Sequence, residues 1–271
     1  HTDSNAGRYN KSLVAKTRLD EITKIAGKAR TYHYEHTLPY QTKGQSILAT
    51  AVMIEYMAEF KKTKTEFNHA VNTFMDHYEI MREEAKFSLG DLYNEEDYPA
   101  ASKLEKKFNM DIDFSPIPEG SHLRIDIDAA DLETMQRDIE ERVNDSVKTA
   151  MDELWKRLYD VTAAIKERLT PDTNGEAKLF RDSLIKNALD LVELLPKLNI
   201  IGDPDLNAMA DEIRRELATI DPQRLRKYSD VRRDTANTAA RIMDKITKRD
   251  PNATPDPEAE LKKIWTAANV P

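Results

Sequence analysis

The fold is decided by residues 46–89, which read SILATAVMIEYMAEFKKTKTEFNHAVNTFMDHYEIMREEAKFSL and contain neither glycine nor proline. Gly44 and Gly90 bracket this stretch. Apolar residues in its second half recur at alternating steps of four and three, which is the heptad pattern of a helix with one apolar stripe. They are Phe67, Val71, Phe74, Tyr78, Met81 and Ala85. At about 1.5 Å per residue, one helix over the whole stretch would be roughly 65 Å long, and its stripe needs a partner.

The expected partner is a second uninterrupted stretch, residues 129–169. Its apolar residues recur at a mean spacing of about 3.7 residues, close to the period of a straight helix. They are Leu132, Met135, Ile139, Val143, Val147, Ala150, Leu154, Leu158, Val161, Ile165 and Leu169. Pairing of the two stretches predicts a mainly α fold, built on a long antiparallel helical hairpin.

Residues 90–128, between these helices, are expected to form a small head. Two runs, residues 110–114 and 123–128, alternate apolar with polar or charged residues and flank a loop that contains proline and glycine. This pattern is typical of a β-hairpin. Because a lone hairpin is marginally stable in water, we expect it to lie against the helix ends.

The remaining segments are expected to form a helical base. Helices are predicted over residues 8–30, 177–198, 203–219 and 221–248, the last two opened by Asp-Pro pairs. Residues 32–40 are expected to be an extended connector, since the residue before Pro39 is disfavoured in a helix. The predicted organisation is one elongated helical domain over residues 1–249, followed by a proline-rich linker and a short helix within residues 250–271.

Composition excludes several classes of protein. Charged residues make up 33% of the 271 residues, and the net charge of −8 argues against a nucleic-acid coat protein. The absence of cysteine excludes disulfides, thiolate metal sites and a cysteine nucleophile. No apolar run approaches the ~18 residues of a membrane span, and the start lacks a signal-peptide pattern. We therefore expect no membrane contact and a cytoplasmic location, and the missing initiator methionine suggests a fragment or a tag remnant.

Several short phrases together resemble an uncharacterised family encoded by bacteriophages and integrative mobile elements. They are HTLPY (36–40), LGDLY (89–93), DYP (97–99), FSPIP (114–118), LWKRL (154–158), FRDSL (180–184) and LNI (198–200). The resemblance extends over about residues 7–246. It implies a bacterial host cell and gene neighbours that encode MoxR-type AAA+ ATPases and recombination functions. It names no catalytic residue.

The connector is the first candidate for nucleic-acid binding. Its aromatic and histidine side chains lie beside basic residues, and such mixtures can stack bases and hold phosphates. The residues are Arg30, Tyr32, His33, Tyr34, His36, Tyr40 and Lys43. His33 and His36 could also share a metal. The alternative is that the tyrosines anchor the connector to the helices.

The second candidate is a basic stretch near the C-terminus, whose densest part contains Arg224, Arg226, Lys227 and Arg233. Arginine is a fork-shaped phosphate ligand, so this stretch could bind nucleic acid. Acidic residues are interspersed at helical spacing, however, which is more typical of a salt-bridged surface exposed to solvent.

The third candidate is a set of four carboxylates on the predicted β-hairpin, Asp111, Asp113, Asp126 and Asp128. Period-two spacing would place them on one sheet face, where Mg²⁺ or Ca²⁺ could relieve their repulsion. A metal-dependent nuclease is therefore one alternative. The simpler interpretation is a solvated outer face, because no third element completes a catalytic site.

The sequence favours a function in binding. It contains none of the motifs GxxxxGK[ST], GxGxxG, HExxH or GxSxG. We therefore expect a non-enzymatic accessory protein with no catalytic residue, cofactor or metal. The expected partner is another protein, such as the AAA+ ATPase, or a second copy of the chain. The alternatives are a single-stranded nucleic-acid factor in replication or recombination, a metal-dependent nuclease, and a factor that sequesters a host defence protein.

Overall fold

The computed structural model describes residues 11–41, 44–123, 125, 127–249, 255, 257 and 259–261. This part of the chain is mainly α-helical, as predicted, and its single sheet has two short strands. The chain folds as two compact units. The N-terminal unit contains His1–Glu35 and Ile54–Ser115, and the C-terminal unit contains His36–Met53 and Pro116–Pro271. The sequence predicted one domain over residues 1–249 instead. Most of residues 250–271, with the predicted linker and last helix, lies outside the described residues.

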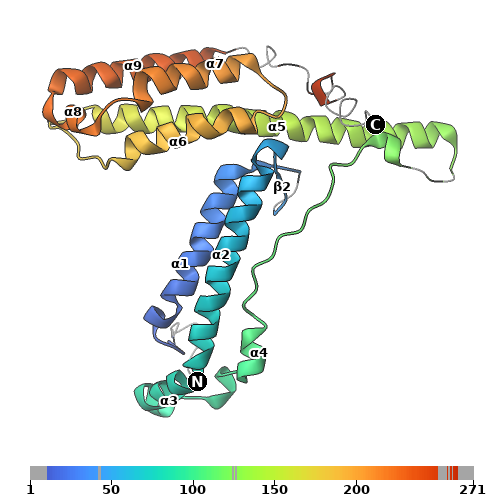
Figure 1. Ribbon diagram of the computed structural model, residues 1–271, viewed down its shortest axis with the longest axis vertical. Coiled ribbons are helices and arrows are strands. Elements are labelled where there is room, and N and C mark those ends of the chain that lie inside the picture. Colours follow the sequence, from blue (N-terminus) through green and yellow to red (C-terminus); the bar gives the residue numbers. More distant parts are fainter. Residues whose placement is uncertain are drawn as a thin grey trace, which may run out of the picture. The chain divides into compact units, whose positions relative to one another are not determined.

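The N-terminal unit is built on a pair of helices that lie side by side (Figure 1). Its elements are α1 (Lys16–His36), α2 (Thr50–Asp76), α3 (Tyr78–Leu89), η1 (Gly90–Leu92), η2 (Glu95–Asp97) and α4 (Ala101–Glu105). Every residue of the predicted heptad stripe is buried. Ile22 of α1 packs in the same cluster as Phe67, Val71 and Phe74 of α2. The stripe is therefore covered within its own unit, and the predicted pairing with residues 129–169 is not confirmed.

Residues 46–89 do not form one helix. Residues 46–47 are a strand, α2 ends at Asp76, and α3 begins at Tyr78. At the break, the His77 amide donates to the Phe74 carbonyl oxygen at 3.2 Å, and its ring Nδ1 lies 2.8 Å from the Thr73 carbonyl oxygen. A side chain that engages the carbonyl groups of the preceding turn competes with the helical hydrogen bonds and bends the helix. The break thus has a local cause that needs neither glycine nor proline.

The predicted β-hairpin is wrong. Residues 110–114 form no strand, and neither do the described residues of 123–128. Met110 packs on the core of the N-terminal unit while Asp111 forms an ion pair with Lys64 of α2. An extended chain alternates its side chains whether or not a neighbouring strand pairs with it. The period-two pattern therefore marks an extended segment with one side against its own unit.

The connector prediction is also partly wrong. Helix α1 continues to His36, so residues 32–36 are helical. Residues 11–15 are not helical, and residues 8–10 lie outside the described part of the chain. The extended segment is shorter than predicted and contains β1 (Leu38–Pro39). This strand pairs antiparallel with β2 (Ser46–Ile47), and Leu38 lies opposite Ile47. The residue before Pro39 is extended, as the proline rule requires.

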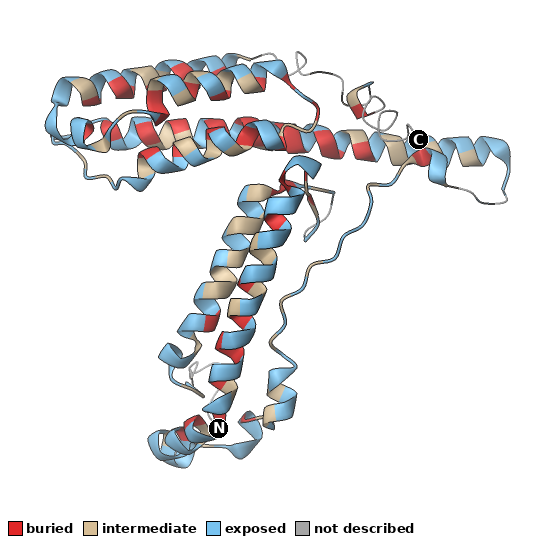
Figure 2. Cartoon of the chain, viewed as in Figure 1, coloured by how far each residue is buried: buried red, intermediate tan, exposed pale blue. Residues whose placement is uncertain are grey.

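The C-terminal unit surrounds one long helix, α5 (Ala129–Leu169). The other elements are η3 (Gly120–His122), α6 (Ser183–Leu198), α7 (Pro204–Ile213), the π-helical segment η4 (Arg214–Ala218), α8 (Pro222–Lys227) and α9 (Ser229–Lys248). Helix α5 contacts α6, α7, α9 and β1. Buried residues concentrate between these helices (Figure 2). The apolar residues predicted on α5 are fully buried at Leu154, Leu158 and Leu169, whereas Met135 near its start is exposed.

Aspartate side chains cap three helices of this unit, α5, α7 and α8. Asp128 accepts a hydrogen bond from the Ala130 amide at 2.9 Å and caps α5. Asp203 accepts from the Asp205 amide at 2.9 Å and Asp221 from the Gln223 amide at 2.9 Å, which caps α7 and α8. A carboxylate at these positions satisfies free amide groups of the first turn. The Asp-Pro starts predicted from the sequence are therefore confirmed.

Candidate interaction surface

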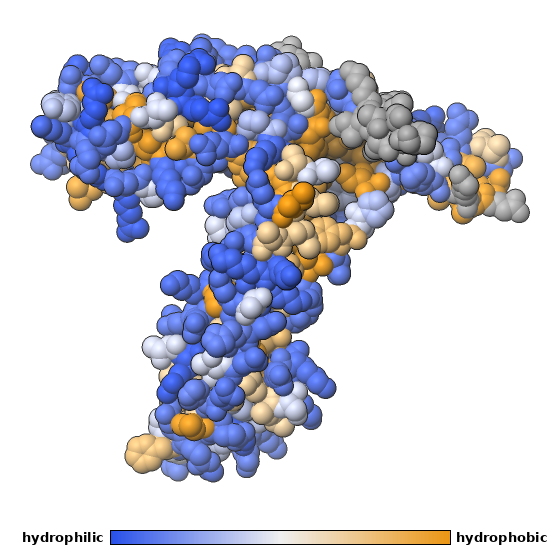
Figure 3. Space-filling view, in the orientation of Figure 1, coloured by the Kyte–Doolittle hydropathy of each residue, from blue (hydrophilic) through white to orange (hydrophobic). Residues whose placement is uncertain are grey.

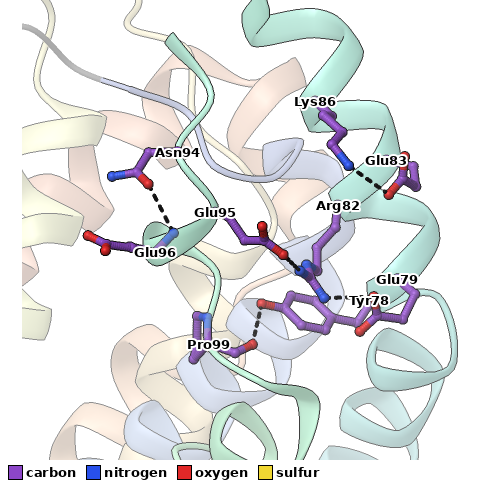
Figure 4. Close-up of polar contacts among 9 residues, drawn as sticks. All are labelled: Tyr78, Glu79, Arg82, Glu83, Lys86, Asn94, Glu95, Glu96 and Pro99. Atoms are coloured by element: carbon purple, nitrogen blue, oxygen red, sulfur yellow. Dashed lines mark hydrogen bonds and ion pairs between the residues drawn. The ribbon is translucent and has the colours of Figure 1, made fainter. Parts of the chain in front are cut away.

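Helix α3 is held by aromatic contacts with the segment that follows it. The Tyr78 hydroxyl donates to the Pro99 carbonyl oxygen at 2.8 Å, as Figure 4 shows. The Tyr98 hydroxyl donates to the Leu13 carbonyl oxygen at 2.8 Å, and the rings of Tyr93 and Tyr98 stack with centroids 5.1 Å apart. These contacts fix one face of α3 against its own unit and leave the opposite face open.

Ion pairs add to this arrangement. Arg82 donates to Glu79 at 2.8 Å and to Glu95 at 3.3 Å, so it links α3 to η2 (Figure 4). Lys86 donates to Glu83 at 3.4 Å. Burial alone would lower the pKa of Arg82, but Glu79 and Tyr93 together outweigh it and raise that pKa. The two cations of α3 are thus engaged by its own acidic residues.

The open face of α3 carries two apolar side chains. Phe87 is 92% exposed and Ile80 is 55% exposed. They are seven residues apart, which places them within about 20° of each other around a helix. The buried residues Tyr78, Met81 and Ala85 occupy the other side. Figure 3 shows that the surface around α3 is hydrophilic with isolated apolar spots. Aromatic side chains are the residues that most often anchor protein interfaces, so the exposed Phe87 makes this face a candidate contact site.

The same segment is strongly acidic. Between residues 76 and 97 the chain has eight acidic residues and two basic ones, a net charge of −6 within a chain of net charge −8. The acidic residues are Asp76, Glu79, Glu83, Glu84, Asp91, Glu95, Glu96 and Asp97. A surface of this charge repels polyanions and attracts cationic partners.

Sequence reasoning missed this surface, although one signal pointed to it. Ile80 and Phe87 are a heptad apart and lie outside the stripe formed by Tyr78, Met81 and Ala85. Apolar residues that repeat at seven on the polar side of an amphipathic helix are unexpected. A helix-by-helix inspection of the polar faces could have found them.

The aromatic candidates in α1 are engaged with α2. His33 Nδ1 lies 2.8 Å from the Tyr56 hydroxyl oxygen, and the rings of Tyr32 and Tyr56 have centroids 5.9 Å apart. Burial lowers the pKa of His33. Tyr34 is exposed and its ring makes an edge contact with His33. These contacts favour the anchoring interpretation over a base-stacking platform.

The charge around these rings is also unsuited to phosphate. Burial raises the pKa of Tyr32, and the nearby carboxylates of Glu59 and Glu55 raise it further. Arg30 is exposed on the same helix. Tyr40 belongs to the C-terminal unit, where it packs on the core. Lys43 lies outside the described residues.

The C-terminal arginines divide into structural and exposed ones. Arg226 forms an ion pair with Asp182 and lies over the Phe180 ring, 5.0 Å from its centroid. Arg224, Lys227 and Arg233 are exposed. Lys227 lies 5.3 Å from the centroid of the neighbouring Tyr228 ring, and Arg233 is 3.9 Å from Asp234.

The buried arginine of this region was not among the four predicted residues. Arg232 donates to the carbonyl oxygens of Leu169 at 3.1 Å and Arg168 at 2.8 Å, and also to that of Lys178. It therefore satisfies the carbonyl groups at the C-terminal end of α5, where a cation also complements the helix dipole. Burial lowers its pKa. This arginine stabilises the fold and is not available to a phosphate.

The four predicted hairpin aspartates have separate surroundings. Lys64 hydrogen bonds to Asp111 and lowers its pKa, and Asp128 caps α5. Asp113 is exposed, and Asp126 lies outside the described residues. Within the described part of the chain, no group of three or more His, Asp or Glu side chains is arranged to hold a metal ion. The sheet face on which the nuclease alternative depended is not formed.

No helix among the described residues is long and apolar enough to span a membrane. No family model, curated protein or solved structure matches the chain. The resemblance to a mobile-element family therefore stays a prediction from the sequence, and the α3 surface is the site on which a functional proposal can be based.

Proposed function

We propose that this chain is a non-enzymatic accessory protein of a phage or mobile element and acts by binding another protein through the open face of α3. One observation carries the proposal, the 92% exposure of Phe87 on a helix whose other face is fixed by its own unit. An exposed aromatic side chain has no stabilising role in the folded chain, whereas aromatic anchors dominate the energetics of protein interfaces.

The proposed setting is the cytoplasm of a bacterial host, in DNA metabolism. The first partner to test is the AAA+ ATPase encoded beside the relatives implied by the resemblance, and self-association is the second. Both fit an interface that gains affinity from a few apolar anchors in an otherwise polar surface.

Site-specific photo-crosslinking tests the proposal. A photoreactive phenylalanine analogue replaces Phe87 in cells that carry the element, and crosslinked products are identified by mass spectrometry. The matched control places the same analogue at Asn72, which is exposed on α2 of the same unit. We expect a discrete protein adduct at position 87 that is absent at position 72. If the analogue gives no protein adduct at position 87 and none at position 80, the proposal is contradicted.

Single-stranded nucleic-acid binding is the second candidate, and the exposure of Arg224, Lys227 and Arg233 is the observation that favours it. A titration with labelled single-stranded DNA at two salt concentrations tests it. Binding through three phosphate contacts would weaken steeply as salt increases. Absence of binding at low salt would remove this candidate.

A further inference from the structure

The open face of α3 has a regular pattern. Ile80, Glu83, Glu84 and Phe87 follow the spacing i, i+3, i+4 and i+7, which places all four on one side of a helix. Two carboxylates thus lie between two exposed apolar side chains. We propose that this face takes a basic amphipathic helix of a partner protein, an inference that rests on the proposed function and specifies its partner.

A helical partner follows from the spacing. Two apolar anchors seven residues apart lie about 10.5 Å apart along the helix axis, which matches two turns of a partner helix laid alongside. Two amphipathic helices that pair side by side contact each other through side chains at spacings of three, four and seven residues. A partner side chain inserted between Ile80 and Phe87 would also cover apolar surface that is now in water.

A basic partner follows from the charges. Glu83 lies 3.4 Å from Lys86, and Glu84 lies 3.8 Å from Arg18, with all four side chains largely exposed. Pairs of this length and exposure contribute little to stability, so a partner's lysine or arginine can replace them. Asp76, Asp91 and Glu96 have no ion pair among the described residues. The net charge of −6 over residues 76–97 is then complemented by the partner.

Other occupants fit less well. Nucleic acid and anionic lipid surfaces are polyanions and would be repelled by this charge. A second copy that presents the same face would place like charges opposite each other. A small ligand would need a concave site, whereas the anchors here lie on the outer side of a single helix.

The test uses the full-length chain and two synthetic helices. Both probes are fluorescein-labelled, about 20 residues long, and share one leucine stripe at positions i, i+3, i+4 and i+7. The remaining positions carry lysine and arginine in the basic probe and glutamate in the acidic probe. Fluorescence anisotropy measures binding. We expect the chain to bind the basic probe at least tenfold more tightly than the acidic one.

Two variants and one control separate the contributions. Glu83→Lys with Glu84→Lys should invert the preference, so that the acidic probe binds more tightly. Phe87→Ser should weaken the basic probe at least tenfold with an unchanged circular dichroism spectrum. The control, Glu133→Lys with Glu141→Lys, makes the same net charge change at exposed positions of α5 and should change binding less than threefold.

Several outcomes would overturn the inference. These are a control variant that weakens binding as much as the α3 variant, a Phe87→Ser variant that binds normally, or a concentration-dependent dimer by light scattering that Phe87→Ser abolishes. The proposed function has its own test, and it fails if no protein is crosslinked at position 87 or at position 80. If photo-crosslinking at position 87 captures a protein that has no basic helix, protein binding stands while the inferred chemistry of the partner is wrong.

Discussion

The two units bury apolar surface in different ways. In the N-terminal unit, the buried cluster is small and consists of Ile22 of α1 and six residues of α2 and α3. In the C-terminal unit, α5 is contacted by α6, α7 and α9, and its buried residues spread over a wide face. Among the described residues, the largest fully buried side chains belong to the C-terminal unit, with Tyr78 as the exception. We infer that the C-terminal unit is the more stable one.

Matched methionine truncations should separate the units most strongly. Met151 in α5 is 1% exposed and Met81 in α3 is 3% exposed. Met151→Ala should cost about 3–5 kcal/mol, because surrounding helices prevent collapse of the cavity, and Met81→Ala about 2–3 kcal/mol. Trp155 is buried in the C-terminal unit, so its fluorescence reports on that unit while circular dichroism reports on both.

Denaturation followed by the two probes measures these effects. Met151→Ala should shift the unfolding transition of the C-terminal unit, which fluorescence detects. Met81→Ala should shift the transition of the N-terminal unit, which only circular dichroism detects. Coincident transitions in every variant would mean that the units unfold as one cooperative block.

Two neighbouring arginines provide the next test. Arg232→Met leaves three backbone carbonyl groups without their donor and should cost the C-terminal unit about 2–3 kcal/mol. Arg233→Met removes an exposed residue 3.9 Å from Asp234 and should change stability by less than about 0.5 kcal/mol. Urea denaturation followed by tryptophan fluorescence compares them. Equal effects would refute the structural role of Arg232.

Two glycines provide a smaller contrast. A Cβ at Gly120 would lie 2.5 Å from the Gln136 carbonyl oxygen of α5, so Gly120→Ala should cost about 1–3 kcal/mol. Gly27 lies within α1, and a Cβ there meets nothing within 4 Å. Gly27→Ala should therefore stabilise the N-terminal unit by about 0.5–1 kcal/mol. Thermal unfolding measured by circular dichroism should move in opposite directions for the two variants.

Acid should affect the units in different pH ranges. Burial lowers the pKa of His33, so the unfolded chain takes up a proton first and the N-terminal unit loses stability as pH falls below the ordinary value of 6.5. Burial alone would raise the pKa of Glu212, but Lys245 and Arg241, at 2.7 and 2.8 Å, outweigh it and lower that pKa. Its contribution to the C-terminal unit is complete above 4.5 and is lost below that value.

Denaturation midpoints measured from pH 7.5 to 3.5 check this difference. His33→Gln should remove the loss of stability that begins below pH 6.5 in the dichroism transition. Glu212→Gln should reduce the loss below pH 4.5 in the fluorescence transition. An unchanged pH profile in His33→Gln would show that burial of this ring does not cause the pH dependence of the stability of the N-terminal unit.

Local features were predictable from the sequence, whereas the helix partners were not. The stripe from Phe67 to Ala85 and the caps at Asp203 and Asp221 depend on neighbouring residues, and the structure has them all. A stripe shows that a helix needs a partner, but several helices of this chain have suitable stripes. The stripe pattern alone therefore does not identify α1 as the partner of α2.

The candidate sites were predicted less well because residue type does not reveal whether a side chain is already engaged. Tyr32 and His33 resemble a stacking platform, yet they contact Tyr56 of α2. Arg226 resembles a phosphate ligand, yet it pairs with Asp182. The exposed Phe87 was assigned no role, because its neighbours Glu83 and Glu84 make the segment look like an ordinary solvated helix.

The break at His77 determines which side of α3 faces solvent. The buried stripe stays on the same side of the helices across the break, since Phe74 before it and Tyr78 after it are both buried. Each additional helical residue rotates everything after it by about 100°. One alanine inserted beside His77 would thus either expose Met81 and Ala85 or turn Phe87 toward the interior of its unit. The number of residues at the break is therefore more strictly constrained than their identity. Deletions or insertions there should harm binding more than substitutions do.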